Sequence, residues 1–82
     1  MKEQQDKIKN FIEETFLVTF GDDLEKDTNL FESSIVDSYG MVQLISFLES
    51  EFSIKLSDEE LMSDELTTFA SISRMVERKV SE

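Results

Sequence analysis

The spacing of apolar residues near the start of the chain predicts an amphipathic helix from about Lys2 to Val18. Apolar side chains and two threonines recur there at steps of three and four residues, which places them on one face of a helix. That face should be buried, and Gly21 follows as the residue expected to end the helix. The stripe consists of Ile8, Phe11, Ile12, Thr15 and Thr19, with Phe16 beside it.

A polar connection follows, from Asp22 to Asp37. Loops of this length in small domains are usually functional or disordered. Apolar residues within it favour an ordered loop that lies across the helices. Its acidic start lacks the alternating ligands and the central glycine of an EF-hand, so we do not expect a calcium site. The expected anchors are Leu24, Leu30, Phe31, Ile35 and Val36.

A second amphipathic helix is predicted from Ser38 to about Phe52. Asp37 and Ser38 are both favourable N-cap residues, and neither is followed three positions later by the Glu or Gln of a capping box. Gly40 is unusual there, because glycine inside a helix costs about 1 kcal/mol relative to alanine. We interpret it as keeping the Ser38 hydroxyl accessible; the alternative is a frayed first turn. The buried face should comprise Met41, Leu44, Ile45, Leu48 and Phe52.

The rest of the chain predicts one short and one long helix. Ser57 and Glu60 form a capping-box pattern, which indicates a short helical turn before Ser63. The last helix should begin near Thr67 or Thr68, with basic residues toward its end, where cations suit the helix dipole. Its stripe is Phe69, Ile72, Val76 and Val80. With no pattern of period two, we expect an all-α fold, three main helices and one short helix, in a single domain of residues 1–82.

Composition excludes several classes of function. Of 82 residues, 19 are acidic and 8 are basic, for a net charge of -11. This charge opposes binding to nucleic acid or anionic lipid and favours partners with basic surfaces. The chain has no cysteine, hence no disulfide framework. Apolar runs are too short for a membrane span, so we expect a cytoplasmic monomer without membrane insertion.

Ser38 is the candidate for chemistry, but not as part of an enzyme. A serine hydroxyl is a weak nucleophile that needs an adjacent base, and the chain has no histidine. The sequence also offers no other catalytic constellation and no metal-ligand cluster. If Ser38 reacts, another protein must activate it; otherwise it serves only as an N-cap.

The segment from Leu30 to Ile54 resembles the acyl carrier protein and phosphopantetheine-binding family. In that family an Asp-Ser-Leu signature opens the second helix, matched here by Asp37 and Ser38 with Tyr39 in place of leucine. A Leu-Glu-x-x-Phe-x-Ile segment closes it, as at residues 48–54. The resemblance extends over nearly the whole chain.

The resemblance implies an acyl-carrier-like four-helix bundle and a 4'-phosphopantetheine arm attached to Ser38. A separate phosphopantetheinyl transferase would add the arm, with Asp37 helping that enzyme to hold its metal and coenzyme A. The arm would carry an acyl or aminoacyl group as a thioester. Expected partners are the transferase, a cognate loading enzyme and downstream synthases with basic docking surfaces.

The outward face of the second helix departs from the family pattern. Carriers of housekeeping fatty acid synthesis typically have acidic residues at the positions of Gly40 and Gln43, whereas this face is uncharged. That difference favours a dedicated carrier in a specialised pathway, of lipid, polyketide or nonribosomal peptide type. Our candidate partner contacts are Tyr39, Val42, Ser46, Phe47, Glu49 and Glu51. The alternative function is an acidic helical interaction module without covalent modification.

Overall fold

The computed structural model describes residues 2–81 and consists of helices joined by loops. Within this range the only β-type pairing is an isolated bridge between Phe20 and Leu24. The predicted all-α class is therefore confirmed. The elements are α1 (Lys2–Phe16), α2 (Ser38–Phe52), α3 (Asp58–Leu61), the 3-10 helix η1 (Asp64–Leu66) and α4 (Phe69–Val80).

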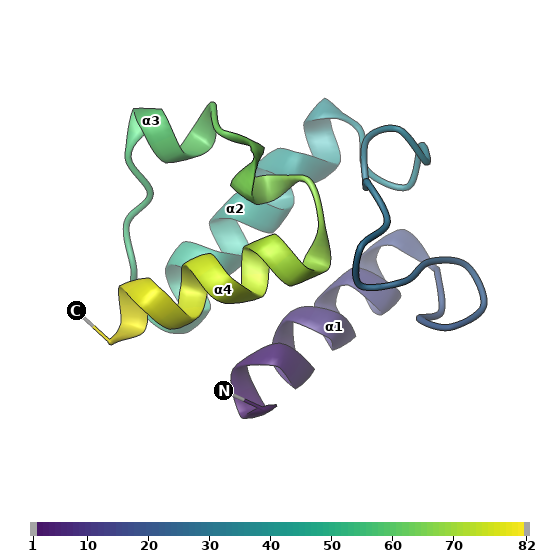
Figure 1. Cartoon of the computed structure of the whole chain (residues 1–82), viewed down its shortest axis with the longest axis horizontal. Helices are drawn as coiled ribbons and strands as arrows, with labels where there is room; N and C mark the ends of the chain where they lie inside the picture. The colour runs from purple at the N-terminus through teal and green to yellow at the C-terminus, as the bar shows by residue number, and fades with distance from the viewer. Residues whose placement is uncertain (1, 82) are drawn as a thin grey trace.

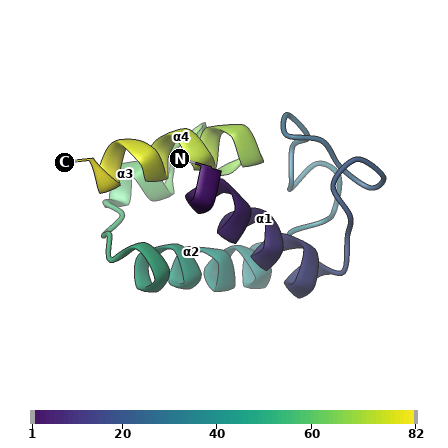
Figure 2. The ribbon, with the colours of Figure 1, turned by 90° about the horizontal axis from the view of Figure 1, so that it is seen from below.

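The three long helices pack against one another and enclose the core. Each of α1, α2 and α4 contacts the other two, and α3 and η1 connect the end of α2 to the start of α4 (Figure 1). The loop between α1 and α2 forms one end of the molecule, and α2 begins beside it (Figure 2). The core comprises Ile8, Ile12, Leu24, Leu30, Val36, Met41, Leu44, Leu48, Leu56, Leu66, Phe69, Ile72, Met75 and Val76.

Helix α1 ends at Phe16, before the predicted boundary at Val18. Leu17 adopts a left-handed conformation, with φ of 57°, and the Val18 N–H donates to the Glu13 carbonyl at 3.2 Å. This is a Schellman termination, which usually has glycine in the left-handed position. The sequence analysis expected Gly21 to end the helix, so the predicted C-terminus of α1 was placed too late. Thr19 consequently lies outside the helix and is exposed, contrary to its predicted place in the stripe.

The long loop is ordered, as predicted, and it is anchored both by side chains and by its backbone. Leu24, Leu30 and Val36 are buried. The Leu30 N–H donates to the Thr67 carbonyl at 2.8 Å, which joins the loop to the residue before the N-cap of α4. Phe31, another expected anchor, is instead 43% exposed. The same correction applies to Val80 at the end of α4, which is 41% exposed.

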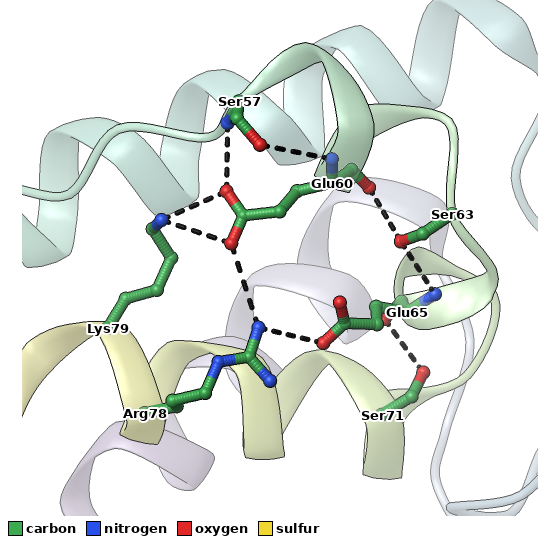
Figure 3. Close-up of polar contacts among 7 residues, drawn as sticks. All are labelled: Ser57, Glu60, Ser63, Glu65, Ser71, Arg78 and Lys79. Carbon is green, nitrogen blue, oxygen red and sulfur yellow. Dashed lines mark hydrogen bonds and ion pairs between the residues drawn. The ribbon is translucent and has the colours of Figure 1, made fainter.

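Helix α3 is held in place mainly by polar contacts. It has no buried residue, and the predicted capping box is present between Ser57 and Glu60. The Glu60 carboxylate also accepts two hydrogen bonds from Lys79 Nζ, at 2.9 and 3.1 Å. Arg78 joins Glu60 to Glu65 on η1, with N–O distances of 3.6 and 2.9 Å (Figure 3). We call these four charged residues the α3–α4 latch.

Among residues 2–81, no helix combines the length and the apolar character that crossing a membrane would require.

Candidate functional site

The start of α2 is capped by Asp37 rather than by Ser38. The Asp37 backbone is extended, and its Oδ1 accepts a hydrogen bond from the Gly40 N–H at 2.7 Å. The absence of a capping box was predicted from the sequence. Ser38 is the first residue of the helix, so the interpretation of Ser38 as the N-cap is wrong.

The Ser38 side chain is available for chemistry. It is exposed, and within the described part of the chain its hydroxyl has no hydrogen-bond partner. The first-turn N–H groups of Ser38 and Tyr39 precede the first backbone bond of the helix, which runs from Met41 to Asp37. A helix N-terminus of this kind favours an anionic group. The position therefore fits a phosphate ester on the Ser38 oxygen.

Gly40 lies where α2 packs closely against the end of α1. It is buried, and a Cβ atom added there would lie 2.7 Å from Cε1 of Phe16 and 3.3 Å from the Asp37 carboxylate. Phe16 at the end of α1 thus sits against the first turn of α2. Burial and the bond to Asp37 show that the first turn is not frayed, contrary to one interpretation of Gly40, and they remove Gly40 from the outward face.

The rest of the predicted outward face is exposed and uncharged. Tyr39 is 72% exposed and Val42 is 60% exposed. Gln43, Ser46 and Ser50 are also exposed. We define Tyr39, Val42 and Ser46 as the neutral α2 face.

Two other candidate contact residues have roles inside the fold. Phe47 stacks on Phe11, with ring centroids 4.2 Å apart, and lies against the core. Glu49 accepts a hydrogen bond from the Leu56 N–H at 3.0 Å and so fixes the segment after α2. Both positions favour a structural role over a partner contact.

Glu51, the last candidate contact residue, is more exposed. Its carboxylate pairs with Lys7 of α1 at 3.0 Å, and both side chains are substantially exposed. Such a pair contributes little to stability and can open for a partner.

Some residues that shape the site were not found from the sequence. Phe16 was expected only beside the stripe of α1, and nothing in its own segment indicates Gly40 as its neighbour. The pairing of Glu60 with Lys79 likewise joins two distant segments. The capping-box motif identified Glu60 itself, but no signal in the sequence identified its second partner.

Similar proteins support a carrier function. Residues 7–76 match the protein family described as "Phosphopantetheine attachment site". A probable acyl carrier protein, PigG, from Serratia sp. (strain ATCC 39006) is 32% identical over 74 residues, which cover 90% of this chain and 85% of that protein. A D-alanyl carrier protein from Streptococcus pyogenes serotype M5 (strain Manfredo) is 36% identical over 72 residues, which cover 85% of this chain and 91% of that protein.

The family match covers most of the chain and includes all of α2, where the exposed serine lies. Both relatives align over nearly their whole lengths. The chain therefore belongs to the phosphopantetheine-binding family of carrier proteins, which bear a covalent 4'-phosphopantetheine group and are not themselves catalysts.

Proposed function

We propose that this protein holds acyl or aminoacyl groups on a 4'-phosphopantetheine arm attached to Ser38. The observation that carries the proposal is the exposed, unpartnered hydroxyl of Ser38 in the first turn of α2. When bound, the arm supplies a terminal thiol that forms a thioester, a group that this cysteine-free chain lacks. The two relatives, an acyl carrier protein and a D-alanyl carrier protein, support both cargo classes.

Attachment would be a displacement at phosphorus in coenzyme A. The Ser38 oxygen forms the new P–O bond, the pyrophosphate bond breaks, and the adenosine bisphosphate portion leaves. The proton of the Ser38 hydroxyl passes to a base on the transferase, because this chain has no histidine to accept it. The positive end of the α2 dipole would stabilise the negative charge that the phosphodiester adds at Ser38.

Asp37 would assist attachment of the arm in two ways. By accepting the Gly40 N–H at 2.7 Å, it fixes the first turn of α2 and hence the position of Ser38. Its charge would also help the transferase to hold a metal ion, as the family resemblance implies. Across residues 2–81, no group of three acidic side chains is arranged to hold an ion.

Replacing Ser38 tests the attachment site. Its oxygen makes no hydrogen bond in the described chain, so Ser38→Ala should change the free energy of unfolding by no more than about 0.5 kcal/mol. After coexpression with a phosphopantetheinyl transferase, the wild type should gain the mass of the arm and Ser38→Ala should not. Ser50→Ala, an exposed serine on the same helix, is the control and should be modified normally. Normal modification of Ser38→Ala would place the arm elsewhere, and an unmodified wild type would favour the unmodified interaction module.

We further propose that the neutral α2 face is the contact surface for the loading enzyme. An exposed aromatic beside an apolar residue provides buried contact energy, whereas exposed charges mainly alter association rate and salt dependence. Tyr39→Ala should therefore weaken loading by at least about tenfold, or 1.4 kcal/mol, when kcat/KM for loading is measured on the modified carrier. Glu59→Gln, an exposed charge change on α3, should have only a mild effect, mainly at low salt. The reverse ranking would show that recognition depends on acidic residues.

A further inference from the structure

Most unpaired cations of this acidic protein gather at one place. The chain has 8 basic residues against 19 acidic ones. Lys7, Arg78 and Lys79 are engaged in ion pairs. Among the basic side chains that the structure describes, those without an ion pair are Lys9, Lys26, Lys55 and Arg74. All of these except Lys55 border two adjoining surface hollows.

The two hollows lie between α1, the long loop and α4. One has a volume of about 410 Å³ and is bordered by Lys9, Phe20 and Glu25. The other has a volume of about 320 Å³ and is bordered by Arg74 and Glu77. Lys26 and Phe69 border both, so the hollows form one elongated depression, which we call the α1–α4 groove. No residue of α2 borders it, so it is separate from the proposed attachment site.

A buried serine at the groove lacks a hydrogen-bond partner. Ser73 is 6% exposed, and its hydroxyl has no partner within the described residues. Leaving a buried hydroxyl unpaired costs about 1–3 kcal/mol, and such groups call for a specific explanation. Ser73 also borders the second hollow, but its oxygen is itself fully covered, so Ser73 serves here only as a probe of this part of the groove.

The groove also presents the half-buried ring of Phe20 on a fixed backbone. Phe20 and Phe69 meet edge to face, with centroids 5.0 Å apart, and Lys9 Nζ lies 5.5 Å from the centre of the Phe20 ring. The Ala70 N–H donates to the Lys26 carbonyl at 2.9 Å, which fixes the loop to α4. A preformed site of this kind binds with less loss of conformational entropy.

We propose that the α1–α4 groove binds an acidic peptide segment of a partner protein, one that carries an apolar side chain between its carboxylates. Three cations and two carboxylates give the groove a net positive charge on a chain of net charge -11. The cations are spread along the groove, and Glu25 and Glu77 lie among them. A compact polyanion would be repelled by these carboxylates, whereas an extended peptide can place its own charges beside the cations and its apolar side chain against Phe20.

Peptide titration of the whole protein, followed by amide chemical shifts, tests the proposal. The probe is the blocked pentapeptide Asp-Glu-Phe-Asp-Glu, and its neutral control is Asn-Gln-Phe-Asn-Gln. The acidic peptide should shift the amides around Phe20, Lys26 and Ser73 in a saturable manner, and the neutral peptide should not. Lys26→Gln should weaken binding by at least about threefold, within the range of an exposed ion pair. Lys55→Gln makes the same change in net charge away from the groove and should leave the affinity unchanged.

Three results would overturn the proposal. Absence of saturable shifts at the groove would show that it does not bind acidic peptides. Equal weakening of peptide binding by Lys26→Gln and Lys55→Gln would show that the peptide responds only to long-range charge. Inorganic phosphate that produces the same shifts with the same affinity would make the groove a small-anion site rather than a peptide site. None of these results depends on whether Ser38 carries the arm.

Discussion

Gly40 lies where α2 comes closest to the end of α1, and Phe16 occupies the space that a side chain would need. Gly40→Glu should therefore lower the free energy of unfolding by about 1–3 kcal/mol, the usual cost of overpacking, with added repulsion from Asp37. Gln43→Glu introduces the same residue at an exposed position of the same helix and should change stability by no more than about 0.5 kcal/mol. Urea denaturation of both variants measures the difference. Equal stability of the two variants would show that Phe16 moves aside freely. In a Phe16→Ala background, Gly40→Glu should lower the free energy of unfolding by less.

For single residues, the sequence predicted the roles that depend on neighbours along the chain. Asp37 and Ser38 were identified because cap residues and a helix start can be recognised locally. The choice between them depended on backbone conformation, which residue type alone does not determine. The role of Gly40 depends on Phe16, which belongs to another helix, so it became visible only with the packing of α1 against α2.

The α3–α4 latch should make part of the protein's stability depend on pH. Hydrogen bonding to the Ser57 N–H and to Lys79 lowers the pKa of Glu60 from 4.5 to about 2. Because the folded-state pKa is depressed, the stabilisation by Glu60 is fully present above about pH 4.5 and is lost as the pH falls toward about 2. The Glu60 side chain is 18% exposed and that of Lys79 is 15% exposed, so solvent screens this pair only partly.

Glu60→Gln should lower the melting temperature above about pH 4.5, and its difference from the wild type should shrink as the pH falls toward 2. The reason is that protonation removes from the wild type the same charge that the substitution removes. Thermal denaturation over this pH range provides the measurement. Glu59→Gln, an exposed neighbour on α3, has the same effect on net charge and should differ little from the wild type at any of these pH values. A difference for Glu60→Gln that does not vary with pH would contradict the assigned pKa.

At the scale of elements, the starts of the helices were predictable where local cap residues mark them. The start of α2, the capping box of α3 and the Thr68 cap of α4 all agree with the sequence. The end of α1 was misplaced because leucine, rather than glycine, adopts the left-handed conformation there. The helix η1 was not predicted. The latch was not predicted either, because its contacts join α3 and η1 to residues near the end of α4.

For the whole molecule, the excess of negative charge is large relative to its size. The extents are 34 × 25 × 19 Å, and the net charge is -11. The Debye length is about 30 Å at 0.01 M ionic strength and about 8 Å at 0.15 M. At the lower ionic strength, carboxylates on opposite sides of the molecule therefore repel one another, whereas at the higher one mainly near neighbours interact.

Added salt should consequently raise the melting temperature from low to moderate ionic strength. Screening also weakens the ion pairs, but Lys7–Glu51 and the Arg78 pairs involve half-exposed basic side chains, and pairs of this kind contribute only about 0–1 kcal/mol each. Relief of the repulsion among the excess carboxylates should outweigh that loss. Thermal denaturation in sodium chloride and in magnesium chloride at equal ionic strength separates general screening from specific cation binding, because screening alone gives similar curves. A melting temperature that stays flat over this range would show that the internal ion pairs already balance the repulsion.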